Sequence, residues 1–189
     1  MRLFVACEIG DAAREAAAGL IDGLRRRAAG AAPDARITWV APERLHLTVR
    51  FIGETHAEQG ARVLEALRDP IEVAPFTIEW GALGAFPPKG SPRVLWAGVE
   101  RGADDLARVE QAVSRRLITL GIAPEDRPYR PHLTLARVRD AAGLRAGPLL
   151  EGLAATLGRS PVRAITLFES RLSPKGPTYT ALHQTRLQA

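Results

Sequence analysis

Apolar residues recur along the chain with two different periods, which predicts a succession of strands and helices. Leu3, Val5, Cys7 and Ile9 alternate with other residues and indicate a strand over 2–9. Apolar residues three and four positions apart over 104–120 predict an amphipathic helix that Gly121 ends. The same reasoning predicts further strands over 36–40, 45–52, 76–83, 93–99, 132–138, 162–172 and 179–187.

Two more helices are expected where a capping residue precedes an apolar pattern. Asp11 is expected to cap a helix that ends near Gly30, and Thr55 with Glu58 forms a capping-box pattern before a helix that stops at Pro70. Gly- and Pro-rich turns join several strands, and the segment up to about Ser160 is broken by both residues. Hairpin-like turns favour antiparallel pairing, so we expect an α+β fold rather than a doubly wound parallel sheet. Strand and helix units occur on both sides of residue 90, and we interpret residues 1–189 as one domain with two related lobes.

Composition and charge exclude only a few classes of function. The chain has 189 residues, of which 46% are hydrophobic and 25% charged, as in an ordinary globular protein. We find no signal peptide and no apolar run of membrane-spanning length, and the single cysteine, Cys7, leaves no internal disulfide and no Cys-rich metal cage. A cytoplasmic location follows as an expectation. The net charge of +5 suits a polyanion such as RNA, but all basic residues except Lys89 and Lys175 are arginine, which equally fits the nucleotide composition of the gene.

The most informative feature is a repeated tetrapeptide. His46-Leu47-Thr48-Val49 recurs 86 positions later as His132-Leu133-Thr134-Leu135, each time inside an expected strand. Because strand side chains alternate, each His and Thr point to one face and the apolar pair anchors the other face in a core. If the two lobes face each other, two imidazoles and two hydroxyls converge on one cleft. The alternative is an ordinary pair of strands with His and Thr on a half-exposed face.

This set of groups suits the opening of a cyclic phosphate. One imidazole deprotonates water and the other protonates the departing ribose oxygen, since the pKa of histidine lies near neutrality. The hydroxyls of Thr48 and Thr134 donate hydrogen bonds to the non-bridging oxygens. No carboxylate cluster or His-x-x-x-His pattern accompanies the histidines, so we expect neither a metal nor another cofactor.

The two motifs resemble those of the two-histidine (2H) phosphoesterases, specifically the LigT-like RNA 2′,3′-cyclic phosphodiesterases. The resemblance extends to the opening segment 2–6 and to the residues that flank the motifs (50–53, 130–131 and 136–137). It continues into segment 167–172, with Tyr179 on the last strand. It implies a bilobal α+β fold in which each lobe is an antiparallel sheet with helices on its outer face, with the cleft between the lobes. It also implies His46 as proton donor, His132 as proton acceptor and a 2′-phosphate product, with 2′–5′ RNA ligation as an associated activity. The implied partner is RNA that ends in a 2′,3′-cyclic phosphate, and we expect a monomer that does not bind membranes.

Phe51 and Arg137 both lie five residues after a motif histidine. LigT-like proteins carry the same two residue types there, which makes Arg137 a candidate phosphate ligand and Phe51 a candidate base-stacking residue. Strict alternation places both on the face away from the histidines, so these roles require a bulge, a twist or a strand end. Core packing for Phe51 and a surface salt bridge for Arg137 stay open.

Several other residues are candidates with a simpler explanation. Arg50 and Arg130 share the parity of the histidines but also suit a solvated position, and Tyr179 suits hairpin packing as well as the cleft. His183-Gln184-Thr185 is a third His-x-Thr without apolar anchors or a partner repeat, and we interpret it as unrelated to catalysis. The remaining side chains are expected on solvated helix faces (His56 and the Arg25–Arg27 run) or in the core (Trp39, Trp80, Trp96). Three functions stay open: an RNA 2′,3′-cyclic phosphodiesterase, a related enzyme for small cyclic or 2′–5′-linked nucleotides, and a non-catalytic RNA-binding module.

Overall fold

The computed structural model describes residues 1–174 and 176–189. The described residues form four α-helices and one short 3₁₀ helix: α1 (Asp11–Ala31), η1 (Pro42–Arg44), α2 (Ala57–Ala66), α3 (Ala103–Ile118) and α4 (Ala146–Leu150). They also form ten strands: β1 (Arg2–Glu8), β2 (Arg36–Trp39), β3 (His46–Glu54), β4 (Ile71–Glu72), β5 (Phe76–Phe86), β6 (Val94–Arg101), β7 (His132–Asp140), β8 (Arg159–Val162), β9 (Ala164–Ser173) and β10 (Gly176–Gln188). No helix formed by these residues is both long enough and apolar enough to cross a membrane.

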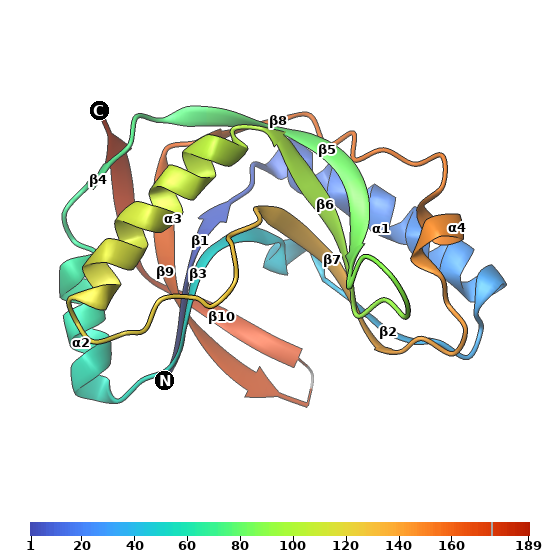
Figure 1. Ribbon diagram of the computed structural model, residues 1–189, viewed down its shortest axis with the longest axis horizontal. Helices are drawn as coiled ribbons and strands as arrows, with labels where there is room; N and C mark the ends of the chain where they lie inside the picture. The colour runs from blue at the N-terminus through green and yellow to red at the C-terminus, as the bar shows by residue number, and fades with distance from the viewer. Residues whose placement is uncertain (175) are drawn as a thin grey trace.

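The strands form one sheet in the order β4-β10-β9-β1-β3-β7-β6-β5-β8, with β2 also paired to β7. The first half of the sheet, β4 to β3, and the second half, β7 to β8 with β2, meet where β3 and β7 cross the middle of the molecule (Figure 1). Among the described residues, one pair of Cα partners, Leu47 and Leu133, joins the two halves. The expected α+β fold with two lobes is therefore confirmed, with the two sheets fused at that pair, and we infer a single bilobal domain.

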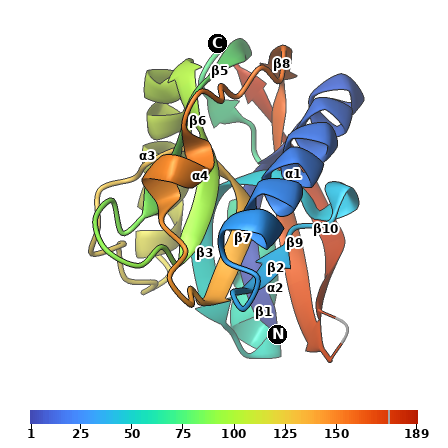
Figure 2. The same ribbon diagram turned by 90° about the vertical axis from the view of Figure 1, so that its right-hand side faces the viewer.

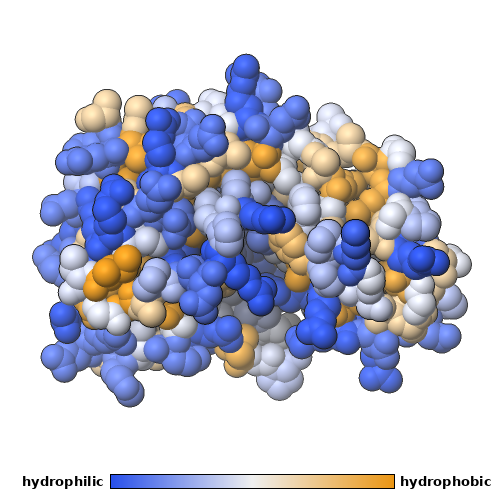
Figure 3. Space-filling view, in the orientation of Figure 1, coloured by the Kyte–Doolittle hydropathy of each residue, from blue (hydrophilic) through white to orange (hydrophobic). Residues whose placement is uncertain are grey.

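Helices cover the two halves separately. Helices α2 and α3 lie over the first half, and α1 and α4 lie over the second (Figures 1 and 2). Each long helix buries one stripe, as the apolar spacing predicts: α3 buries Leu106, Val109, Val113 and Leu117, and α1 buries mainly small residues, with Ile21 and Leu24. The space-filling view is hollowed between the halves, near the centre of the face shown (Figure 3).

Both predicted helix caps are wrong. Gly10, not Asp11, occupies the N-cap of α1, and no side chain caps it. His56 occupies the N-cap of α2, because the Thr55 hydroxyl donates instead to the carbonyl oxygen of Met1 at 3.1 Å. Where β1 and β3 pair, the Thr55 hydroxyl therefore hydrogen-bonds to Met1 and does not cap the helix.

The sequence pattern missed two short strands, and several of the observed strands are longer than predicted. Strand β4 has two residues and pairs with β10 in parallel, unlike the antiparallel pairs elsewhere. Strand β8 contains Pro161 and lies in the segment expected to be irregular, where it pairs with β5 as an edge strand. An edge strand tolerates proline because one of its sides needs no ladder hydrogen bonds. The predicted hairpin of β9 and β10 is confirmed, although Lys175 in its connection lies outside the described residues.

A buried arginine joins β3 to the chain segment that leads into β7. The Arg50 side chain is 2% exposed and lies 3.9 Å from a carboxylate oxygen of Glu110 and 3.8 Å from one of Glu125. It also donates a hydrogen bond to the carbonyl oxygen of Ala123. The expectation that Arg50 shares the face of His46 is wrong, since its side chain points to the helix-covered side of the sheet. Arg50 therefore holds the 121–131 segment against the first half.

We expect Arg50→Met to lower the free energy of unfolding by about 2–3 kcal/mol. Removing one partner of a fully buried ion pair costs ~3–5 kcal/mol, and the half-exposed Glu125 makes this case milder. Urea denaturation measures the change. Arg62→Met, at an exposed position of α2, is the matched control and should stay within about 0.5 kcal/mol of the parent. Equal effects of the two substitutions would contradict the assigned role of Arg50.

Candidate active site

The two repeated motifs lie side by side at the junction of the two halves. Leu47 and Leu133 are fully buried, whereas the motif histidines and threonines are half-buried on the opposite face of their strands. The Leu47–Leu133 pair sets an antiparallel register. Extending that register places His46 across from Thr134 and Thr48 across from His132. Cβ atoms of diagonal neighbours in a regular sheet are about 7–8 Å apart or slightly less, so the two imidazoles can reach one phosphate.

Both imidazoles are held in the same way. The Nδ1 atom of His46 lies 2.7 Å from the carbonyl oxygen of Arg44, and the Nδ1 atom of His132 lies 2.7 Å from that of Arg130. A carbonyl oxygen only accepts hydrogen bonds, so in each ring Nδ1 carries the proton. Nε2 of each ring is then the atom that gives or takes a proton. Arg130 thus orients His132 through its backbone, while its side chain is exposed.

A bulge occupies the last position of each motif. In β3 the register slips at Val49, since Val5 pairs with Arg50 and Ala6 with Thr48. In β7 it slips at Leu135, since Leu95 pairs with Ala136 and Trp96 with Thr134. One inserted residue reverses the alternation beyond it, because two residues then oppose one on the partner strand.

The bulges bring Phe51 and Arg137 to the face of the histidines. Phe51 is 53% exposed, and its ring lies 6.3 Å from that of Phe4, which also contacts His46. Arg137 is exposed and close enough for its charge to lower the pKa of both His46 and His132. The strand irregularity that these two candidates required is therefore present in both halves.

Aromatic rings flank each imidazole. Phe4 lies 5.0 Å and Tyr179 5.3 Å from the ring of His46, the latter edge-on. Phe86 lies 5.1 Å edge-on and Trp96 6.4 Å from the ring of His132. Sequence reasoning did not single out Phe4 or Phe86. The even positions of 2–8, which alternate with the core residues, were the available signal for Phe4.

The expectation that Trp96 is a core residue is wrong, since it lies half-buried beside His132. It packs flat over Gly84, where a Cβ atom would clash with the indole ring. Trp80 is buried as expected, and Trp39 is half-buried with the guanidinium of Arg25 5.9 Å above its ring. Within the Arg25–Arg27 run, Arg27 binds the carbonyl oxygens of Leu149 and Glu151, so this run partly serves the contact between α1 and α4.

The environment favours the neutral form of both imidazoles. Burial lowers the pKa of His46, and the charges of Arg137 and His132 lower it further, while the hydrogen bond to the Arg44 carbonyl opposes these effects. Burial also lowers the pKa of His132, again aided by Arg137 and opposed by the Arg130 carbonyl. A bound anion between the rings would reverse the sign of the local field and favour a proton on one of them.

Two other histidines lie elsewhere. His56 is exposed at the start of α2. His183 lies on β10 opposite Leu167, and its buried Nε2 has no hydrogen-bond partner among the described residues. The hydroxyl of Thr185 donates to the carbonyl oxygen of Leu67, so it serves the fold.

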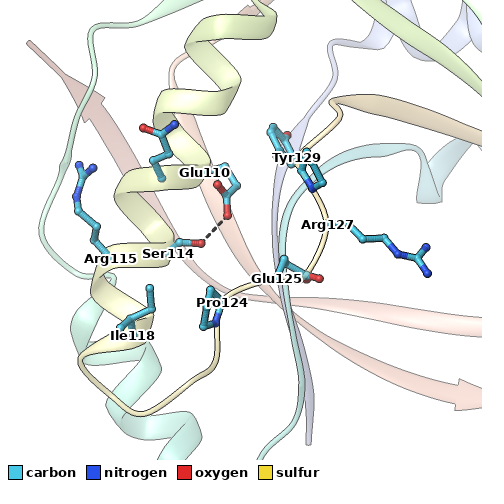
Figure 4. A pocket seen from close by; sticks show the side chains of 10 residues that line it. Glu110, Ser114, Arg115, Ile118, Pro124, Glu125, Arg127 and Tyr129 are labelled. Carbon is cyan, nitrogen blue, oxygen red and sulfur yellow. Dashed lines mark hydrogen bonds between the residues drawn. The ribbon is translucent and has the colours of Figure 1, made fainter.

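A separate cavity of about 380 Å³ lies between α3 and the segment that precedes β7 (Figure 4). Glu110 and Ser114 line it from the helix, and Glu125 and Tyr129 from the segment. None of the predicted site residues line it, but the hydroxyl of Tyr129 donates to the carbonyl oxygen of Thr48 at 3.0 Å. The wall of this cavity thus connects the two motif strands. Within 1–174 and 176–189, no group of three or more His, Cys, Asp or Glu side chains is placed to hold a metal ion.

Residues 13–172 match the family model of the 2′-5′ RNA ligase superfamily. The chain belongs to this superfamily. It is 36% identical over 182 residues to a protein of Archaeoglobus fulgidus named RNA 2′,3′-cyclic phosphodiesterase, covering 96% of this chain and 98% of the relative. It is 39% identical over 149 residues to a protein of the same name from Aeropyrum pernix, covering 78% of this chain and 84% of the relative.

Solved structures agree with this placement. TT0787 of Thermus thermophilus superposes with a TM-score of 0.78 at 30% identity, covering 99% of this chain and 98% of that structure. LigT of Escherichia coli in complex with 3′-AMP superposes with a TM-score of 0.73 at 25% identity, covering 100% of this chain and 98% of LigT. The predicted resemblance to LigT-like proteins is confirmed.

We expect Arg137→Ala to raise the pKa of both His46 and His132, because it removes a positive charge that disfavours their protonated forms. Titration of the imidazole Cε1–H resonances by NMR measures both values. Arg137→Lys keeps the charge and should leave both pKa values near those of the parent. An Arg137→Ala variant with unchanged titrations would show that the guanidinium lies too far away to contact the same phosphate.

Proposed function

We propose that the protein hydrolyses the 2′,3′-cyclic phosphate at the end of an RNA to a 2′-phosphomonoester, with His46 and His132 as its acid and base and without a metal ion. The observation that carries the proposal is the pair of matched imidazoles, each with Nδ1 bound to a carbonyl oxygen and Nε2 available. The names of the superfamily relatives support the substrate. The proposal includes a monomer that acts in the cytoplasm.

In this mechanism Nε2 of neutral His132 accepts a proton from water as the water oxygen attacks phosphorus. The bond between phosphorus and O3′ breaks, and protonated His46 donates its Nε2 proton to O3′, which leaves as a hydroxyl. The product carries the phosphate on O2′, and proton exchange with solvent resets both rings. The resemblance to LigT-like enzymes supports this assignment of donor and acceptor.

The neighbouring side chains have separate tasks in the proposal. The hydroxyls of Thr48 and Thr134 donate hydrogen bonds to the non-bridging oxygens, where charge accumulates in the transition state. Arg137 adds charge-assisted hydrogen bonds there. The exposed ring of Phe51 is suited to stack on the terminal base, and Tyr179 orients the ring of His46 by its edge-on contact. Arg130 contributes its carbonyl oxygen.

A second candidate is 2′–5′ RNA ligation, which the name of the family model favours. A 5′-hydroxyl would replace water as the nucleophile: His132 would accept the proton of that hydroxyl as its oxygen bonds to phosphorus, and His46 would again donate its proton to O3′ as the bond between phosphorus and O3′ breaks. The third candidate is action on small nucleotides, which is favoured by solved complexes of LigT with 3′-AMP and with ATP. Mass and linkage analysis of the products from a cyclic-phosphate-ended oligonucleotide, with and without a 5′-hydroxyl acceptor, separates hydrolysis from ligation.

His46→Ala and His132→Ala should each lower kcat about 10²–10⁴-fold, the usual contribution of a general acid or base. The double variant should lose less than the product of the two effects, because both groups serve one step. Steady-state kinetics on a 2′,3′-cyclic nucleotide measures these losses. His183→Ala is the matched control and should change kcat less than about twofold. A loss of kcat in the control as large as that in His132→Ala would mean that the second catalytic histidine has been assigned wrongly.

The pH profile of kcat/KM should be bell-shaped, with its maximum on the acid side of the ordinary histidine pKa. The rising limb reports deprotonation of His132 and the falling limb reports deprotonation of His46, and burial together with Arg137 lowers both pKa values. The activity should survive excess chelator. A chelator-sensitive activity that a divalent ion restores would exclude the metal-free mechanism.

A further inference from the structure

A group of basic side chains extends from Arg137 of the proposed site along the second half of the sheet. Beyond Arg137 it consists of four exposed residues: Lys89, Arg93, Arg139 and Arg145. Among the residues that the structure describes, no carboxylate lies within 4 Å of any of these four side chains. Arg159 and Arg116 are held by a carboxylate and by carbonyl oxygens, whereas exposed arginines such as Arg62 have no such partner among the described residues. These four residues are therefore distinguished by their shared position beside the proposed site rather than by lacking a partner.

The group is continuous with the site through the connection between β5 and β6. Phe86, whose ring contacts His132, begins this connection, and the amide of Arg93 donates to its carbonyl oxygen at 2.7 Å. Arg93 in turn accepts at its carbonyl from the amide of Val138 at 2.9 Å, and Val94 pairs with Arg137. The path from His132 to Arg93 and Arg139 thus runs over adjacent, hydrogen-bonded backbone.

A hollow of about 610 Å³ lies at the end of this path. One wall is the β5–β6 connection with Pro88, Gly90 and Ser91, and the other is the segment from Gly143 to Pro148, which carries Arg145. These two segments lie at the same end of the second half (Figures 1 and 2). Most residues that line the hollow are glycine, proline, serine or alanine, and Leu144 and Arg145 are the larger side chains.

One carboxylate, that of Asp140, lies near these cations in the sequence and forms no ion pair with them among the described residues. Asp140 ends β7 beside Arg139, and its Oδ1 accepts from the amide of Ala142 at 3.1 Å. In the first half, two cations of the described residues have partners of their own. Arg171 lies 3.1 Å from Glu169, and Arg44 donates to the carbonyl oxygen of Pro177 at 3.4 Å. The four cations of the second half, by contrast with Arg171 and Arg44, have no such partner among the described residues.

We propose that these four cations, together with the hollow that Arg145 lines, bind the RNA strand that precedes the terminal nucleotide, through its phosphates. This inference rests on the proposed function, since a cyclic phosphate at the 3′ end leaves the rest of the strand to exit the site on one side. Exposed arginines and lysines bind phosphates with little dependence on base sequence. These cations therefore select for strand length and polyanionic character, while the chemistry stays with the two histidines.

The test compares a mononucleotide 2′,3′-cyclic phosphate with a short oligoribonucleotide that ends in the same group. The variant is Lys89→Ala with Arg139→Ala and Arg145→Ala, and the matched control is Arg62→Ala on α2, an exposed arginine of the other half. We expect the triple variant to raise KM for the oligonucleotide about tenfold and to leave the mononucleotide kinetics within about twofold, since each exposed ion pair contributes modestly. The slope of log KM for the oligonucleotide against log salt concentration should fall by about 0.7 for each phosphate that the variant no longer binds.

Each other outcome overturns the inference. These outcomes are an equal loss on both substrates, no difference between the triple variant and Arg62→Ala, and an oligonucleotide KM equal to that of the mononucleotide in the parent protein. Competition by polyglutamate as strong as that of RNA would overturn the choice of RNA over an acidic protein. Fluorescence anisotropy of a labelled oligonucleotide measures binding without turnover. A different result is a parent protein that binds the strand through these cations and yet hydrolyses neither substrate. That result would contradict the proposed function but would still support the inference that these cations bind RNA.

Discussion

The fully buried pair of Leu47 and Leu133 is the constraint on which the site depends. Both leucines belong to one buried core, in which α3 packs near β3 and α1 near β7, and the pair itself is the described Cα link between the two halves of the sheet. Because strand side chains alternate, burying these two residues forces the neighbouring histidines and threonines onto the opposite face. The apolar core thus sets the direction of the polar groups, and no polar contact between the motifs is needed to bring them together.

Each half then repeats the same local construction. A carbonyl oxygen two residues before the histidine fixes its Nδ1, and a bulge three residues after it reverses the alternation. The repetition ends at the fifth residue, where one half has the aromatic Phe51 and the other has the cationic Arg137. A substrate with a base on one side and phosphates on the other matches this asymmetry, as does the row of cations that lies beyond Arg137.

The segment before β7 connects the halves a second time. Arg50 holds it through Ala123, Glu110 and Glu125, and Tyr129 donates to the carbonyl oxygen of Thr48. Burial raises the pKa of the Tyr129 hydroxyl, so it stays a hydrogen-bond donor over the whole range in which the histidines titrate. The carbonyl that orients His132 belongs to the next residue, Arg130. The orientation of the second imidazole therefore depends on contacts with the first half.

The sequence by itself determined the α+β class, the main strands and helices, and the pairing of two His-x-Thr motifs, because periodicity and repetition are local properties. It did not determine the helix caps, since Thr55 is used by Met1 across the sheet, nor the edge strands β4 and β8, which are too short to show a period. The direction of Arg50, Phe51 and Arg137 was likewise decided by the tertiary structure. A bulge arises from the register between two strands that are distant in sequence, and the alternation within one strand carries no record of it.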